Sequence, residues 1–298
     1  MMIDLKNITV DDKALFDRYF AIKQYGICDL NFTNLFMWRE TYSVRYAVVD
    51  DFLCIFPQFQ KDSPFVLMPV GCGDLGAVVH KLAAHFKAQG NPFVIKGVTE
   101  GMKNELMERV PGKFIFEEDR NIFDYVYLSA DLIELKGKKF HAKRNHINKF
   151  KSMYDYTYEP LTAERVDECA AAALKWCVKR NCEEDQGLGW EKIAILNALH
   201  NFDKLKFKGG ILRVDGKIAA FTFGERLTDN MAVVHVEKGD PDIRGSYAVI
   251  NQMFCEREWR HMKYVNREED MGLPGLRKAK LSYRPVTLVE KYTAKWQE

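Results

Sequence analysis

The chain contains 298 residues, of which 47% are hydrophobic and 13% aromatic, and its 44 basic side chains nearly balance its 42 acidic ones. This composition is ample for globular cores, and the length predicts two domains of about 150 residues each. No run of about 18 apolar residues is present, so the sequence predicts no membrane-spanning helix. The first residues alternate charged and apolar side chains and lack the apolar core of a signal peptide, which favours a cytoplasmic location.

The seven cysteines are odd in number and scattered through apolar surroundings. They form no CxxC pair and no cysteine–histidine cluster with zinc spacing, so no metal site is expected. Cys169 and Cys177 are eight residues apart on one expected helix, and we interpret both as small core side chains.

The first half predicts, in chain order, two helices, a β-hairpin, a strand, a helix, a strand, a short helix and two closing strands. Thr9 is expected to cap the first helix and Gly90 to end the third, while the pair Asp50–Asp51 forms the hairpin turn. The expected helices cover 15–23, 32–40, 73–90 and 101–110, and the expected strands cover 42–49, 52–59, 64–70, 93–98, 114–119 and 123–128.

The second half repeats this order. Its hairpin turns at Asp215–Gly216, a dipeptide that strongly favours a tight turn between strands. The expected helices cover 164–181, 189–202 and 246–262, and the expected strands cover 156–162, 208–214, 217–227, 231–239, 263–269 and 286–294.

The hairpins, at about 43–58 and 209–225, occupy the same place in each half. We therefore expect an α+β protein with two copies of one unit, each a mixed β-sheet flanked by helices. The N-terminal unit covers 1–135, a bridging basic helix covers 136–154, and the C-terminal unit covers 155–298. A single large mixed sheet is the alternative.

The bridging segment concentrates positive charge. Seven of the sixteen residues from Lys136 to Lys151 are Lys or Arg, and none is acidic. Phe140, Ile147 and Phe150 recur at helical spacing, which predicts a helix docked by one apolar stripe. The charged face is either a solvated surface or a site for an anionic partner. The side chains expected to bind such a partner are Lys139, Lys143, Arg144, Asn145 and Asn148.

Four sequence segments spread over the chain resemble those of a known family: CDLNFTNLFMW, FDYVYL, LKGKKFHAKRNHINKF and GLRKAKLSYRPVTLVEKY. They are similar to a bacterial domain family of unknown function that is related to the C-terminal domain of phosphatidylglycerol lysyltransferases. The resemblance implies two tandem GNAT-like acyltransferase domains. The second domain is expected to be active and the first a scaffold, because the corresponding stretch of the first half, PVGCGDLGAVVHKL, has no arginine and no comparable cationic tail.

A GNAT domain binds its donor where the strand after the hairpin splays from its neighbour and a helix begins. Here the corresponding loop precedes residue 246, and Arg244, Gly245 and Ser246 are the candidate anion-binding residues. The coenzyme A pattern is incomplete, because Tyr247 stands at a glycine position. Glu237 and Asp270 close the neighbouring strands and are the candidate catalytic proton acceptors.

The tail LRKAKLSYRP resembles the cationic cluster of aminoacyl-transferring relatives, and Arg277, Lys280 and Tyr283 are its candidate substrate-binding residues. The leading hypothesis is an acyl- or aminoacyltransferase that uses aminoacyl-tRNA as donor and an amine or hydroxyl of a lipid or small molecule as acceptor. One alternative is an acyl-CoA-dependent N-acetyltransferase, and the other is a non-catalytic module that binds nucleic acid or an anionic membrane surface. No permanently bound cofactor is expected, and no oligomeric state is predicted.

Overall fold

The computed structural model describes residues 2–182 and 184–298, which divide into two compact units. The first unit runs to Phe123 and also contains Val289–Glu298, whereas the second covers Asp124–Leu288. These bounds differ from the expected ones, because the strand at 124–128 and the whole basic helix belong to the second unit. Among the described residues, no helix is both long and apolar enough to cross a lipid bilayer.

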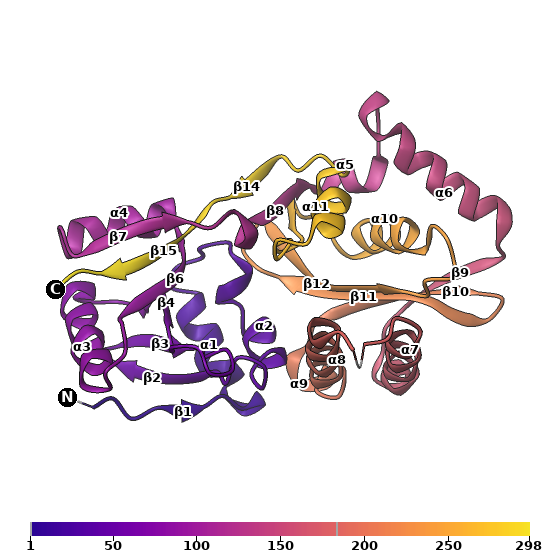
Figure 1. Ribbon diagram of the computed structural model, residues 1–298. Coiled ribbons are helices and arrows are strands. Elements are labelled where there is room, and N and C mark those ends of the chain that lie inside the picture. The colour runs from indigo at the N-terminus through magenta and orange to yellow at the C-terminus, as the bar shows by residue number, and fades with distance from the viewer. Residues whose placement is uncertain (1, 183) are drawn as a thin grey trace. The chain divides into compact units, whose positions relative to one another are not determined.

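The first unit combines helices with two small sheets. Its helices are α1 (Lys13–Phe20), α2 (Phe32–Met37), α3 (Leu75–Ala88) and α4 (Glu100–Arg109). Its strands are β1 (Lys6–Asn7), β2 (Arg45–Val49), β3 (Phe52–Phe56), β4 (Val66–Leu67), β5 (Val70–Gly71), β6 (Val94–Thr99), β7 (Phe114–Glu118) and β15 (Lys291–Trp296). They form sheets with the orders β1-β2-β3-β5 and β4-β6-β15-β7 (Figure 1).

Local signals account for the elements of this unit that the sequence predicted. Thr9 begins a single 3-10 turn that leads into α1, and its backbone N–H donates to Asp12 Oδ2 at 2.7 Å. The hairpin of β2 and β3 turns at Asp50 and Asp51, whose φ angles of 46° and 63° are the positive values that a two-residue hairpin turn requires. Gly90 follows α3 with a φ of 70°, as predicted for a residue that ends a helix.

The second unit contains one large sheet between layers of helices. Its helices are α5 (Ser129–Glu134), α6 (His141–Met153), α7 (Val166–Lys179), α8 (Gln186–Leu199), α9 (Phe202–Leu205), α10 (Ser246–Glu258) and α11 (Pro274–Leu281). Its strands are β8 (Asp124–Leu128), β9 (Tyr156–Pro160), β10 (Lys208–Val214), β11 (Lys217–Arg226), β12 (Met231–Gly239), β13 (Tyr264–Asn266) and β14 (Thr287–Val289). The sheet order is β14-β8-β13-β12-β11-β10-β9.

The helices of the second unit cover both faces of this sheet, with α7 and α8 on one face and α10 on the other (Figure 1). The core beside α10 contains Phe140, Ile147 and Phe150, all at most 3% exposed. The apolar stripe predicted for the basic helix is therefore confirmed. The mixed sheets flanked by helices are also confirmed, as is the hairpin that turns at Asp215 and Gly216.

The two units place their strands in the same order. For this comparison β4 and β5 are taken as two ends of one extended segment. The strand order of the first unit is then β1-β2-β3-β5/β4-β6-β15-β7. The strand order of the second unit, listed from its other edge, is β9-β10-β11-β12-β13-β8-β14. Two strands lie in a different unit from the one expected. The strand β8 closes the first half of the sequence but belongs to the second unit, and β15 closes the second half but belongs to the first unit. Descent from a duplicated unit stays a prediction.

The C-terminal segment also differs from expectation. The single closing strand expected at 286–294 is two strands, β14 in the second unit's sheet and β15 in a sheet of the first unit. The cationic stretch before it forms the helix α11, with Pro274 at its first position, where the missing N–H of proline costs no hydrogen bond.

Candidate functional site

The sheet of the second unit opens between β12 and β13. The two strands pair in parallel only where Met231–Val233 lie beside Tyr264–Asn266. Beyond this point β12 continues to Gly239, whereas β13 ends. His235 is an extra residue opposite the Phe223–Gly224 step of β11, and the β-bulge that it forms bends β12. The opening is the splay that the GNAT resemblance implied.

A buried ion pair lies at this opening. Arg267, directly after β13, donates from Nη2 to Glu237 Oε2 on β12 over 2.7 Å, and Asn251 of α10 donates to the same oxygen over 3.0 Å. The Glu237 and Arg267 side chains are only 11% and 12% exposed. Burial disfavours the charged guanidinium, but the Glu237 carboxylate outweighs this effect and raises the pKa of Arg267.

Lys143 reaches the same place from α6. Its Nζ lies 3.7 Å from the centroid of the Tyr283 ring, and the Arg267 guanidinium carbon lies 4.7 Å from that centroid. Burial and the charge of Arg267 lower the pKa of Lys143 to about 8, against the opposing effect of Glu237. At neutral pH roughly a tenth of this lysine is therefore an uncharged amine. We define the β12–β13 cluster as Lys143, Glu237, Asn251, Arg267 and Tyr283.

Two members of the β12–β13 cluster carry buried atoms without a hydrogen-bond partner. Arg267 Nη1 is such a donor and Asn251 Oδ1 is such an acceptor. Ser246 Oγ, at the start of α10, is also buried and unpaired. Buried polar atoms are nearly always paired in proteins, and an exception needs a reason such as a ligand or a water molecule. The cluster thus offers one unpaired donor and one unpaired acceptor on side chains that bind the Glu237 carboxylate.

Asp270 lies outside the cluster, and its surroundings do not fit the proton acceptor that the sequence suggested. Its fully buried carboxylate accepts from Arg277 Nε and Nη2, both at 2.8 Å, from the Tyr125 hydroxyl at 2.5 Å and from the Gly272 N–H at 2.9 Å. Burial raises the pKa of this carboxyl, but these hydrogen bonds outweigh burial and hold the pKa well below its usual range. Asp270 and Arg277 therefore form an ion pair with each other.

Lys280 joins the same structural arrangement. Its ammonium donates to the backbone carbonyls of Arg267 and Glu269, each at 2.5 Å, and so fixes α11 to the segment after β13. The Tyr127 hydroxyl in turn donates to the Lys280 carbonyl at 2.8 Å. Of the predicted tail residues, Tyr283 is a member of the β12–β13 cluster, and Lys280 binds the backbone carbonyl of the cluster residue Arg267.

The loop before α10 is held by carboxylates. Asp240 and Asp242 both bind the Lys179 ammonium, over 2.7 and 2.5 Å. Arg244 is exposed, and Gly245 has a φ of 97° and packs closely on α6, where an added Cβ would lie 3.2 Å from Phe150 Cβ. Lys179 and Arg244 thus balance the charge of the two aspartates here, and Ser246 is buried rather than displayed to solvent.

Some basic side chains of the basic helix and of the turn before it bind neighbouring groups of the same unit. Lys139 pairs with Asp131 at 2.9 Å, and Arg144 donates to the carbonyls of Leu135 and Gly137. These contacts fix the start of α6 to the end of α5. Asn145 and Asn148 are exposed, as expected for contacts with a partner.

His235, the bulge residue, lies between two carboxylates. Its Nδ1 is 2.9 Å from Glu268 Oε1, its Nε2 is 3.2 Å from Glu225 Oε1, and its side chain is fully buried. Burial alone lowers the pKa of this imidazole, but the two hydrogen-bonded carboxylates outweigh burial and raise the pKa to about 9. His235 is therefore a cation at neutral pH and holds the bulge by charge-assisted hydrogen bonds.

The His235 pKa predicts a pH dependence of stability. Because the folded pKa exceeds the ordinary value near 6.5, the stabilisation is fully present below pH 6.5 or so and is lost as the pH rises through about 9. We expect the free energy of unfolding, measured with urea, to fall by up to about 1.4 kcal/mol per pH unit in this window from this residue. His235→Gln should flatten the slope, whereas replacing the exposed His261 by Gln should not. An unchanged slope in His235→Gln would assign the pH dependence to other groups.

Comparison with known proteins identifies the family to which the chain belongs. The fold consists of two tandem GNAT-like units, and the chain belongs to the family described as phosphatidylglycerol lysyltransferase, C-terminal, whose match covers residues 20–295. This is a family of acyl- and aminoacyltransferase-like proteins.

Solved structures agree with this assignment. A conserved protein of unknown function from Bacteroides thetaiotaomicron is 46% identical, with a TM-score of 0.92 over 99% of this chain and 100% of that one. L-PGS from Bacillus licheniformis shares the fold at 13% identity, with a TM-score of 0.65 over 95% of this chain and 91% of that chain. An uncharacterised protein of Mycoplasmoides gallisepticum is 25% identical over 179 residues, which are 58% of this chain and 56% of that protein. The match thus spans little more than half the length of this curated relative.

Proposed function

We propose that the chain transfers an aminoacyl group from an aminoacyl-tRNA to an amine or hydroxyl acceptor, and that the reaction takes place at the β12–β13 cluster. The observation that carries the proposal is the unpaired acceptor Asn251 Oδ1 and the unpaired donor Arg267 Nη1, which belong to two side chains bound to the same Glu237 oxygen. An aminoacyl ester presents an α-ammonium group and a carbonyl oxygen close together. Glu237 and Asn251 Oδ1 suit the ammonium, and Arg267 Nη1 suits the carbonyl oxygen.

The reaction follows from these roles. The acceptor nitrogen or oxygen attacks the ester carbonyl carbon while the neutral amine of Lys143 takes its proton, and the Arg267 guanidinium stabilises the negative charge on the carbonyl oxygen. The bond between the carbonyl carbon and the ribose oxygen then breaks. The tRNA hydroxyl leaves with the proton that Lys143 held. The pKa of Lys143, about 8, suits a group that both takes and returns a proton near neutral pH.

Two features favour an aminoacyl donor over acyl-CoA. An acetyl group has no ammonium, so it would leave the buried Asn251 Oδ1 acceptor without a partner. The coenzyme A pattern at the start of α10 is incomplete, because Tyr247 stands at a glycine position. A lipid acceptor would approach from a membrane surface, and the exposed basic side chains of α6 suit anionic headgroups or tRNA phosphates.

The test is a transfer assay with radiolabelled aminoacyl-tRNAs, lysyl-tRNA first and then a mixture. Acceptors are phosphatidylglycerol vesicles and a panel of small amines, and thiol release from acetyl-CoA is measured in parallel. We expect label to move from tRNA to an acceptor, with no coenzyme A release. Acetyl-CoA turnover without tRNA turnover would support the N-acetyltransferase instead. Inactivity with both donors, together with tight and salt-dependent RNA binding, would support a binding module.

A further inference from the structure

The helix α11 has the reverse of the usual arrangement of side chains on a surface helix. Arg277 turns toward the protein and binds the buried Asp270, and Lys280 is buried and binds the backbone carbonyls of the segment after β13. Leu276 and Leu281, in contrast, are 37% and 42% exposed. A surface helix normally buries its apolar side chains and exposes its charged ones. The helix α11 therefore presents apolar side chains on the surface of the second unit.

Exposed apolar side chains continue on both sides of α11. Met271 and Leu273 precede most of the helix and Val286 follows it, and all three are at least half exposed. Among the described residues fourteen large apolar side chains are exposed, and five of them lie within the sixteen residues 271–286. Single exposed apolar side chains are ordinary, whereas a group of them marks an interaction surface. We define the α11 patch by these five side chains: Met271, Leu273, Leu276, Leu281 and Val286.

Only positive charge accompanies the α11 patch. Lys278 and Arg284 are exposed, and no acidic residue occurs from Met271 to Val289. Within the described part of the chain, neither of these two cations forms an ion pair. Apolar side chains beside such cations are typical of helices that lie in the interface of an anionic lipid bilayer. The apolar groups enter the boundary between headgroups and acyl chains, and the cations bind headgroup phosphates.

The other face of the sheet lacks this combination of apolar and basic side chains. Leu174 and Val178 are exposed on α7, which lies across the sheet from α10 and α11 (Figure 1). The segment that joins α7 to α8 exposes the carboxylates of Glu184 and Asp185. Carboxylates repel an anionic surface. Leu174 and Val178 are therefore a matched comparison for the α11 patch.

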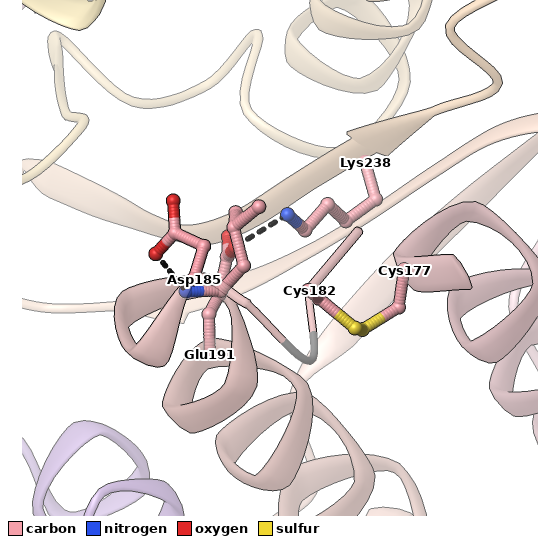
Figure 2. Close-up of a disulfide and its surroundings, with 6 residues drawn as sticks. Cys177, Cys182, Asp185, Glu191 and Lys238 are labelled. Carbon is pink, nitrogen blue, oxygen red and sulfur yellow. Dashed lines mark hydrogen bonds and ion pairs between the residues drawn. A yellow bond between two sulfur atoms is a disulfide. The ribbon is translucent and has the colours of Figure 1, made fainter. Parts of the chain in front are cut away.

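The segment between α7 and α8 also contains a disulfide. Cys177 is bonded to Cys182, with Cα atoms 5.2 Å apart, and Figure 2 shows Asp185 in the surroundings of this bond. The interpretation of Cys177 as a small core side chain is therefore wrong, whereas Cys169 is buried as expected. Asp185 accepts from the Leu188 N–H at 3.1 Å and so caps α8. Its negative charge is thus fixed at the start of this helix.

We propose that the α11 patch docks on the surface of an anionic lipid bilayer, with its apolar side chains among the headgroups and with Lys278 and Arg284 on lipid phosphates. The contact is interfacial, since α11 has eight residues and a helix that spans a bilayer needs about 20. The proposal stands apart from the proposed function, because this contact needs no aminoacyl donor.

A second copy of the chain suits the α11 patch less well than a bilayer does. A symmetric contact places the same surface of both copies together, so Lys278 and Arg284 would meet like charges. A stable protein interface also takes about 20–30 residues a side, more than this patch offers. The charge and the small size of the patch therefore favour the lipid surface.

The experiment is flotation of the full chain with lipid vesicles, without tRNA. One set of vesicles contains one part phosphatidylglycerol and three parts phosphatidylcholine, and the other set contains phosphatidylcholine alone. We expect at least tenfold stronger partitioning to the anionic vesicles, and a decrease when salt is added, because salt screens the attraction between the cations and the headgroups. A chain that does not float with the anionic vesicles would overturn the proposal.

Two double variants test the two parts of the α11 patch. Leu273→Ser with Leu276→Ser removes apolar side chains, and Lys278→Glu with Arg284→Glu reverses the charge. Each should weaken partitioning to the anionic vesicles at least tenfold, while the Tm measured by circular dichroism stays the same, because all four side chains are exposed. The charge variant keeps every apolar side chain, so it remains informative if the serine variant is unstable.

The matched control is Leu174→Ser with Val178→Ser, which makes the same kind of change on α7 and should bind vesicles as the unmodified protein does. Flotation that persists in both patch variants would assign vesicle binding to the basic helix and overturn the proposal. A chain that does not float, and that forms a dimer which the patch variants dissociate in analytical ultracentrifugation, would assign the patch to self-association instead.

Discussion

Glu237→Gln should lower the rate of aminoacyl transfer at least 100-fold and also destabilise the second unit. The amide keeps the shape of the carboxylate but removes the charge to which we assign the substrate ammonium, and charged hydrogen bonds are about twice as strong as neutral ones. It also leaves the buried Arg267 without its anion, 2.7 Å away in the present structure. Loss of one partner from a buried ion pair typically costs about 3–5 kcal/mol. Transfer kinetics and urea unfolding measure the two effects separately.

Asn251→Leu tests the substrate contact at a smaller cost in stability than Glu237→Gln. Asn251 is 1% exposed, its Oδ1 has no partner and its Nδ2 donates to the Glu237 carboxylate, so the variant should lose about 1.5–3 kcal/mol in the free energy of unfolding through that one hydrogen bond. If Asn251 Oδ1 binds the substrate, transfer should still fall by at least tenfold. An Asn251→Leu variant that is fully active would mean that the β12–β13 cluster is structural and that the reaction takes place elsewhere.

Asp270→Asn should give the opposite pattern, with a loss of about 3 kcal/mol in the free energy of unfolding and an unchanged transfer rate per folded molecule. Asp270 is fully buried and accepts from Arg277, Tyr125 and Gly272, so the amide presents an N–H group where one of these donors now points. The folded pKa lies below the unfolded value, so the stabilisation is present above about pH 4 and is lost as the pH falls further. The difference in the free energy of unfolding between the unmodified protein and Asp270→Asn should therefore shrink at acid pH.

The matched control for Asp270 is Glu256→Gln, which breaks the exposed pair between Glu256 and Arg260. A surface pair of this kind contributes about 0.5 kcal/mol, so little change is expected. A Glu256 variant as unstable as the Asp270 variant would show that charge loss anywhere on this unit is destabilising. A 100-fold loss of transfer in folded Asp270→Asn would restore Asp270 as a catalytic residue.

Local signals explain what the sequence predicted well. The turns Asp50–Asp51 and Asp215–Gly216 identified both hairpins, because residues that tolerate positive φ stand between β-rich runs. The stripe of Phe140, Ile147 and Phe150 was also visible, since helical periodicity is a property of neighbouring residues.

The site was harder to predict because it depends on contacts between distant residues. Lys143 was identified by its charge, but its burial is set by Tyr283, 140 positions later. Arg267 was missed inside the acidic run of 267–270, where its neighbours masked its role, and Asn251 was missed in the middle of α10. A basic residue at the end of a strand expected to line the splay was the available signal for Arg267. Asp270 was preferred because a strand-end carboxylate has the same local pattern whether it is catalytic or structural.

The position of β15 has a consequence for how the protein is made. This strand lies between β6 and β7, and its Lys291 is fully buried and bonded to Asp29, near the other end of the chain. During synthesis most of the first unit is translated first, but its second sheet lacks an inner strand until Lys291–Trp296 leave the ribosome. Until then the edges of β6 and β7 are exposed and able to pair with other chains. A message cut short before the codons for Val289–Glu298 would therefore spare nearly all of the second unit and leave the first, although translated up to Phe123, unable to close.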